Sequence, residues 1–142
     1  MTSAKGILLA CTQLALLSGC IQHSNQTEAT KAAIQWSEAY FGYDYHEAER
    51  FCTPESGKWL RFAASNASQD DVDLMGDQTI EVTAIRESAD DTLRFVTLQV
   101  SHFVRPGTVG EPSSLGSDGQ YQLVMVRRNG QWLVKLNGLP RP

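Results

Sequence analysis

The stretch Tyr121–Gly138, YQLVMVRRNGQWLVKLNG, decides the fold of this chain. Apolar and polar side chains alternate on either side of Asn129-Gly130, which is a favoured two-residue turn of a β-hairpin because both positions need a positive φ. The turn fixes the register, and a slip of one residue would exchange the two faces of both strands. The expected cross-strand pairs are Arg127–Trp132, Met125–Val134 and Leu123–Leu136 on one face, and Val126–Leu133 on the other.

Two more strands are predicted before this hairpin, because the hydrophobic period upstream is also two. The first covers about 80–84, Asp90-Asp91 marks a turn, and a long strand follows over about 92–104. The residues between the long strand and the hairpin, 105–119, form a Gly/Pro/Ser-rich loop, which we interpret as a mobile flap without chemistry of its own. One face of the long strand is expected to hold Val96, Leu98, Val100, His102 and Val104.

The first part of the chain has helical periodicity. A helix is predicted over about 27–41, with Asn25 as its N-cap and Gly42 at the position after its end. A third helix is predicted to start at Thr53-Pro54, to run to about Ala64 and to bury Trp59, Phe62 and Ala63. The apolar face of the first helix consists of Ala29, Ala33, Trp36 and Tyr40, spaced four, three and four residues apart.

The segment between these helices, Phe41–Cys52 or FGYDYHEAERFC, has two readings. As a corner, Asp44 caps a short second helix, its polar residues face solvent, and Cys52 is buried with the apolar side. As an active site, Asp44 or His46 would take a catalytic role. We favour the corner, because each polar residue then has a capping role or a solvent-facing position.

The N-terminus has the layout of a secretory signal peptide: one Lys, a mostly apolar run over 6–17, then small residues. Its end, Leu17-Ser18-Gly19-Cys20, resembles the lipobox of bacterial lipoproteins. The resemblance implies cleavage before Cys20, a diacylglyceryl group on its sulfur and an acyl chain such as palmitate on its amine. The expected organisation is a signal peptide over 1–19, a lipidated tether over 20–26 and one domain over 27–142. Because Ile21, and no aspartate, follows Cys20, the resemblance favours the outer membrane, facing the periplasm.

Composition limits the function further. The 142 residues carry a formal net charge of −4, and no cluster of Lys or Arg stands out, so no nucleic-acid partner is expected. The same shortage of basic clusters argues against electrostatic docking on anionic lipid. The three histidines show no metal-ligand spacing, and no phosphate-binding loop or nucleophile elbow is present. We therefore predict no cofactor and no metal.

The order of these elements predicts an α+β fold, with N-terminal helices packed on a curved antiparallel sheet of about four strands. It resembles the nuclear transport factor two-like superfamily, also called cystatin-like in fold. The resemblance rests on YFGYDYHEA at the first corner, CTPES before the third helix and NGQWLVKLNG in the last hairpin. It implies a cone-shaped sheet around the first helix, and some members are isomerases or dehydratases whereas many only bind ligands or partners.

Three functions follow from these observations. The first is a lipid-anchored envelope protein whose domain binds an envelope protein or a small apolar ligand and catalyses nothing. The second is an isomerase or dehydratase with His102 as proton carrier and Tyr40 as orienting donor. The third is a homodimer through Val126 and Leu133. In the first two cases the residues expected to line the pocket are Trp36, Tyr40 and His102.

Overall fold

The computed structural model describes residues 25–142, so the predicted signal peptide and Cys20 lie outside the described part. The fold is mixed: four helices and a 3₁₀ turn come first, and an antiparallel four-stranded sheet follows. The two short strands of a small second sheet lie between the second and third strands of the main sheet in the chain. No helix within 25–142 has the length and apolar character needed to cross a membrane. The helices are α1 (Glu28–Phe41), α2 (Tyr45–Glu49), the turn η1 (Pro54–Ser56), α3 (Gly57–Asn66) and α4 (Gln69–Met75). The strands are β1 (Glu81–Asp90), β2 (Leu93–Ser101), β3 (Val104–Arg105), β4 (Ser114–Leu115), β5 (Asp118–Arg128) and β6 (Gln131–Lys135).

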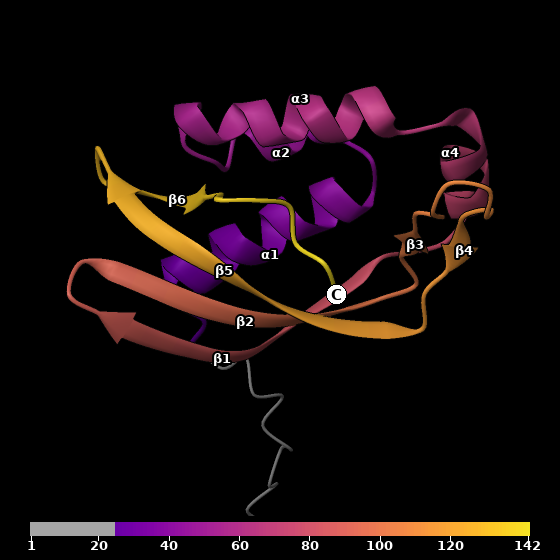
Figure 1. The fold of residues 1–142 in the computed structure, drawn as a ribbon. Helices are drawn as coiled ribbons and strands as arrows, with labels where there is room; N and C mark the ends of the chain where they lie inside the picture. Colours follow the sequence, from indigo (N-terminus) through magenta and orange to yellow (C-terminus); the bar gives the residue numbers. More distant parts are fainter. Residues whose placement is uncertain (1–24) are drawn as a thin grey trace, which may run out of the picture.

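The main sheet has the strand order β1-β2-β5-β6 and bends around α1 on one face (Figure 1). Helices α2 and α3 form a further layer above α1. The two hairpin turns lie at one end of the sheet, whereas α4 and the small β3–β4 sheet lie at the other (Figure 1). Each strand of the main sheet is hydrogen-bonded antiparallel to its neighbour, which confirms the predicted α+β architecture at this level.

The last hairpin has the predicted register. Arg127 pairs with Trp132, Met125 with Val134 and Val126 with Leu133. Asn129 and Gly130 have φ values of 51° and 77°, the left-handed pair that a tight turn of this kind needs. Strand β1 pairs with β2 over its whole length, with a bulge between Ala84 and Arg86.

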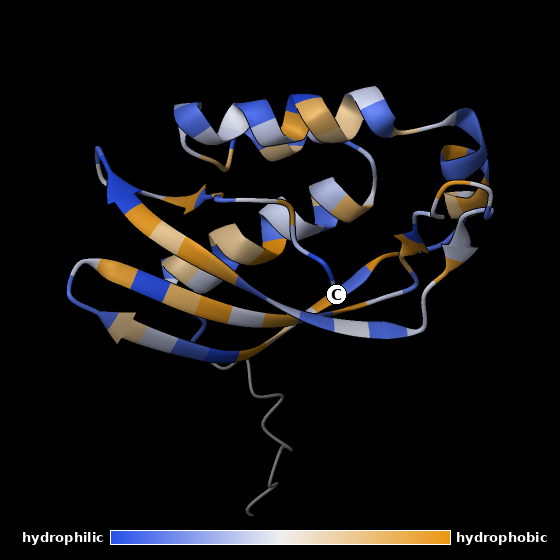
Figure 2. Ribbon diagram, viewed as in Figure 1, coloured by the Kyte–Doolittle hydropathy of each residue, from blue (hydrophilic) through white to orange (hydrophobic). Residues whose placement is uncertain are grey.

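The core lies between α1 and the inner face of the sheet. Alternate residues of β2 and β5 point toward α1, and Figure 2 shows hydrophobic and hydrophilic segments alternating along these strands. Val96, Leu98 and Val100 have no exposed surface, as their spacing predicted. The other fully or nearly fully buried side chains include Ala33, Trp36, Leu60, Leu123, Met125 and Val134.

The predicted N-cap of α1 is wrong, whereas Gly42 directly follows the last helical residue, Phe41, as predicted. The N-cap is Thr27 rather than Asn25, and its hydroxyl accepts a hydrogen bond from Thr30 N–H at 3.1 Å. The same hydroxyl donates to the Glu87 carboxylate at 2.7 Å, so Thr27 also joins α1 to β1. At the other end Gly42 has a φ of −82°, and the left-handed residue is Tyr43, with a φ of 64°. Tyr43 adopts it because Asp44 N–H must turn back to bond the Ala39 carbonyl at 2.9 Å.

The corner after α1 is confirmed; in the third helix Ala63 is buried and Trp59 partly buried as predicted, whereas the predicted burial of Phe62 is wrong. Asp44 caps α2 by accepting a hydrogen bond from Glu47 N–H at 3.0 Å. In α3, Phe62 is 58% exposed and Leu60 is buried in its place. The reason lies in η1: Ser56 is fully buried and accepts a hydrogen bond from Leu136 N–H at 2.9 Å. Fixing Ser56 inward also turns Leu60 and Ala63 inward, four and seven residues later.

The segment 105–119 has more structure than the predicted flap. Val104–Arg105 pairs with Ser114–Leu115, and Gly116 N–H donates to the Phe103 carbonyl at 2.8 Å. The buried Asp71 carboxylate of α4 accepts hydrogen bonds from Ser113 Oγ and, at 2.9 Å, from Ser68 N–H. Burial alone would raise the pKa of Asp71, but the bonds from Ser113 and Ser68 outweigh it and lower this pKa. The hydrogen bond that Ser113 donates to Asp71 therefore holds this segment to α4.

Candidate functional site

Trp36 and Tyr40, two of the three residues expected to line a pocket, do lie together. They come from successive turns of α1, and their rings stack with centroids 4.8 Å apart and an interplanar angle of 9°. Tyr40 also meets Tyr45 edge-on at 5.9 Å, and Phe41 contacts Phe103 and Tyr121. These aromatic rings pack on one another between α1 and the sheet.

Two polar atoms in this aromatic cluster have no hydrogen-bond partner within the described residues. They are the indole Nε1 of Trp36, a residue with no exposed surface, and the hydroxyl of Tyr121, a residue 6% exposed. The Tyr121 hydroxyl lies near Ser37, whose own hydroxyl donates to the Ala33 carbonyl at 2.7 Å. An unpaired buried polar group is costly, so these two atoms are where a water or a ligand oxygen would be stabilised most.

The phenols of this cluster are weak acids. Burial raises the pKa of Tyr40 to about 12, and burial together with the Asp71 carboxylate raises the pKa of Tyr43 to about 12. Burial also raises the pKa of Tyr121. At neutral pH these groups stay protonated, so they can donate hydrogen bonds and are not general bases.

His102, the third predicted pocket residue, does not join the other two. Its side chain is exposed, and its backbone has a φ of 62° directly after β2 ends at Ser101. This left-handed residue breaks the alternation of the strand, so that Phe103 and Val104 are both buried and His102 faces out. The predicted placement of His102 beside Val100 is wrong. The proton-carrier arrangement with Tyr40 that the sequence indicated is therefore not formed.

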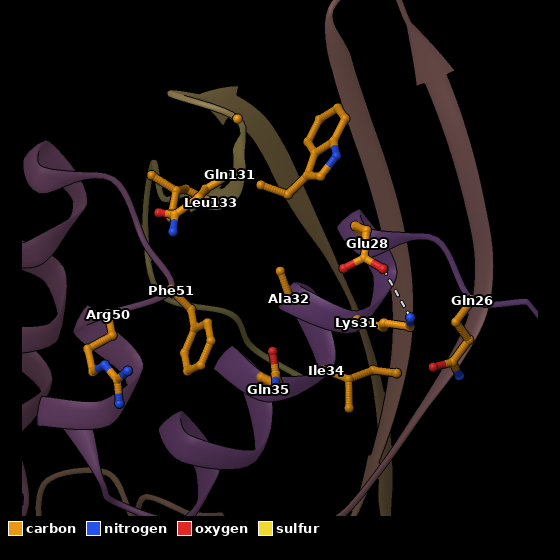
Figure 3. Close-up of a pocket in the computed structure, with 12 residues that line it drawn as sticks. Gln26, Glu28, Lys31, Ala32, Ile34, Gln35, Arg50, Phe51, Gln131 and Leu133 are labelled. Carbon is orange, nitrogen blue, oxygen red and sulfur yellow. Dashed lines mark hydrogen bonds and ion pairs between the residues drawn. The ribbon is translucent and has the colours of Figure 1, made fainter.

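The structure instead forms a groove that the sequence did not indicate. It has a volume of about 570 Å³ and lies between the start of α1, the end of the α2 corner and the last hairpin (Figure 3). In Figure 3, Ala32 and Gln35 of α1 form its floor, Phe51 borders one side, and Gln131 and Leu133 border another. The lining residues are Gln26, Glu28, Lys31, Ala32, Ile34, Gln35, Arg50, Phe51, Gly130, Gln131, Trp132 and Leu133.

A second groove of about 510 Å³ adjoins the first, and the two share Gly130 and Trp132. It lies between the two hairpin turns and is lined by Asp91, Arg94 and Arg127, among others. The Arg94 guanidinium lies 5.2 Å from the centre of the Trp132 ring, a cation–π contact. Trp132 thus lines both the first groove, whose walls are partly apolar, and the second, which holds Arg94 and Arg127.

The walls of these grooves explain why no pattern along the chain predicts them. They come from residues 26–35, 50–51, 91–94 and 126–133, and no local motif joins segments that far apart. Trp132 was visible only as a member of the hairpin.

Cys52 follows Phe51 of the first groove in the chain, and its thiol is buried and protonated at neutral pH. It is 6% exposed, and burial, with a smaller effect of the Glu49 carboxylate, raises its pKa to about 11. Its burial confirms the prediction from the corner.

Within 25–142 no three His, Cys, Asp or Glu side chains gather closely enough to bind a metal ion. Comparison with known proteins gives no match to any family model, curated protein or solved structure.

Proposed function

We propose that this chain is a bacterial lipoprotein whose domain, residues 27–142, binds a partner at the cell envelope and catalyses nothing. The observation that carries the proposal is the Leu17-Ser18-Gly19-Cys20 sequence followed so closely by a folded domain. Lipid on Cys20 would hold the protein stably, because two or more acyl chains anchor where one does not. The outer membrane, on its periplasmic side, is the location that the residues after Cys20 favour.

A lipidated tether this short would keep the domain near the bilayer. Thr27 is fixed by its cap on α1 and by its bond to Glu87, so only six residues, 21–26, separate Cys20 from the first fixed position. Six residues span about 20 Å at most. The first groove, which Gln26 lines, then lies beside the point where the tether enters the domain.

A binding role fits the interior better than a catalytic one. The rings of Trp36 and Tyr40, which were expected to line a pocket, stack on one another instead, and the nearby phenols are protonated at neutral pH. Helices before a curved antiparallel sheet support membership of that superfamily, which remains part of this proposal. A partner would then bind the outside of the domain, where the two grooves are open.

Lipid labelling tests the anchor. Cells producing the full chain are grown with radiolabelled palmitate, and the membrane fraction is washed with high salt. Cys20→Ser should lose the label and the salt-resistant membrane association. Cys11→Ser is the matched control, because it removes a thiol from the same N-terminal segment and should keep both. Salt-resistant membrane binding of the Cys20→Ser variant would contradict the anchor.

One observation favours a homodimer as a second candidate. Val126 and Leu133 pair on the outer face of the sheet, and both are only half-buried. Val126→Asp should reduce the mass in solution to that of one chain if this face pairs two copies. Val109→Asp, in an exposed loop, is the control. An unchanged mass for Val126→Asp would remove this candidate.

A further inference from the structure

Strand β6 is the edge of the main sheet, and most of its outer backbone is already covered. Val134 N–H donates to the Phe51 carbonyl at 2.8 Å, and Thr53 N–H donates to the Val134 carbonyl at 2.9 Å. The segment 51–53 therefore lies beside β6 as a fragment of a parallel strand, bridged at Cys52 and Val134. Two residues further on, Leu136 N–H is satisfied by Ser56 Oγ.

Trp132 is the position where this cover stops. Residues two apart on a strand direct their backbone groups to the same side, so Trp132 N–H and C=O point to the free edge, as those of Val134 do. Within residues 25–142 no hydrogen bond reaches the Trp132 backbone from outside the sheet. The covering segment cannot extend toward Trp132, because Phe51 N–H bonds back to the Ala48 carbonyl at 3.0 Å and the residues before it belong to α2.

This open edge faces the first groove. Trp132 lines it, together with the apolar side chains of Ala32, Ile34 and Phe51. A backbone donor and acceptor beside a groove with apolar side chains is the arrangement that recognises an extended peptide: the main chain supplies hydrogen bonds, and alternate side chains enter the groove. The volume of about 570 Å³ is within the usual range of binding sites.

The charge around Trp132 favours an acidic occupant. Four cations line the two grooves, Lys31, Arg50, Arg94 and Arg127, against two acids, Glu28 and Asp91, which leaves a local formal charge of +2. The whole chain carries −4. Lys31 and Arg50 already bind Glu28 and Glu47 in exposed pairs, which are weak and easily exchanged. Within 25–142 Arg94 and Arg127 form no ion pair with a carboxylate.

We propose that the open edge of β6 at Trp132 binds an extended, acidic segment of a partner polypeptide by strand addition. This inference rests on the proposed partner-binding function and names the partner's chemistry. The segment lies beside Trp132, where the covering segment 51–53 does not reach because the residues before it form α2. Its backbone exchanges two hydrogen bonds with Trp132, its apolar side chains face Phe51 and Ile34, and its carboxylates lie near Arg94 and Arg127.

Model peptides test this with the full chain, purified in detergent and labelled with ¹⁵N. The probe is acetyl-EVEVEVE-amide, and acetyl-KVKVKVK-amide is the control for charge. Before peptide is added, the Trp132 amide should exchange with solvent much faster than the Val134 amide. The acidic probe should shift the Trp132 amide signal and slow its exchange, and the basic peptide should bind at least about tenfold more weakly.

N-methylated peptides show whether backbone bonds carry the binding. Methylation of the valine amides, or of the glutamate amides, removes the donors from one edge of the peptide strand. Only one of these two peptides should lose affinity, by about two- to tenfold or more, because a strand pairs through one edge. These peptides leave the protein unaltered, so no variant needs to fold.

The inference is overturned if Trp132 shows no shift or protection, or if both methylated peptides bind as well as the parent. It is also overturned if a protein partner is crosslinked to another face while the Trp132 amide stays unprotected, although partner binding itself would then stand. The palmitate-labelling experiment tests only the lipid anchor. The peptide experiment is done in detergent and does not depend on that anchor.

Discussion

Ser56→Ala removes a single oxygen atom, but it should destabilise the protein more than the loss of one hydrogen bond ordinarily does. The Ser56 hydroxyl has no exposed surface and serves two groups: it accepts from Leu136 N–H at 2.9 Å and shares a hydrogen bond of 2.6 Å with the Thr53 hydroxyl. Removing it leaves both partners buried without a bond. Each unsatisfied buried group costs about 1–3 kcal/mol, so the expected loss for the two groups is about 2–6 kcal/mol in the free energy of unfolding.

Thr53→Val is the matched control, because it keeps the volume and removes only the bond between the two hydroxyls. Ser56 Oγ can then still accept from Leu136, and the expected loss is about 0.5–1.5 kcal/mol. Urea unfolding measures both variants, with the buried Trp36 as a fluorescent probe. For a slope of about 1–3 kcal/mol per molar urea, a loss of about 3 kcal/mol lowers the midpoint by about 1–3 M. A Ser56→Ala variant no less stable than Thr53→Val would refute this account of η1.

Further predictions concern the buried polar groups. Tyr121→Phe removes a hydroxyl without a partner and should leave the free energy of unfolding unchanged or raise it by up to about 1 kcal/mol; clear destabilisation in urea would show a partner bound there. Cys52, with a pKa near 11, should react with Ellman's reagent at pH 8 only after unfolding, and rapid reaction of the folded protein would contradict its burial. Asp71 has a lowered pKa, so its stabilising effect should be complete above its ordinary value of 3.8 and disappear as the pH falls through the folded value. Asp71→Asn should accordingly be less stable than the native chain at pH 7, by a margin that shrinks in acid, and a margin independent of pH would argue against a charged Asp71.

The parts of the fold that could be predicted from sequence are those with a local cause. Asn129-Gly130 can form only a tight turn, and the alternation behind it then has one register, which the structure has. Asp44 was identifiable as a cap because the bond it accepts comes from a residue three positions away.

The errors have non-local causes. The hydrophobic side chain of Phe62 suggested burial, but the bond between Ser56 and Leu136, 80 residues apart, turns Leu60 inward instead. His102 continues the period of its strand in the sequence, whereas its left-handed backbone ends that period. The grooves around Trp132 depend on four segments brought together only by the fold, so no pattern along the chain could have predicted them.

The two edges of the main sheet differ in a way that bears on self-association. Strand β1 is interrupted by its bulge near Arg86 and carries Glu81, Glu87 and Asp90, features that discourage a second sheet from joining. Within residues 25–142 β1 also leaves its outer backbone groups unbonded, but they are guarded by this bulge and these charges, whereas β6 leaves its own open at Trp132. A fibril grows by adding copies through two receptive edges on each molecule, and this protein has one. Even at high concentration, an exchange of strands between copies would therefore stop at a pair.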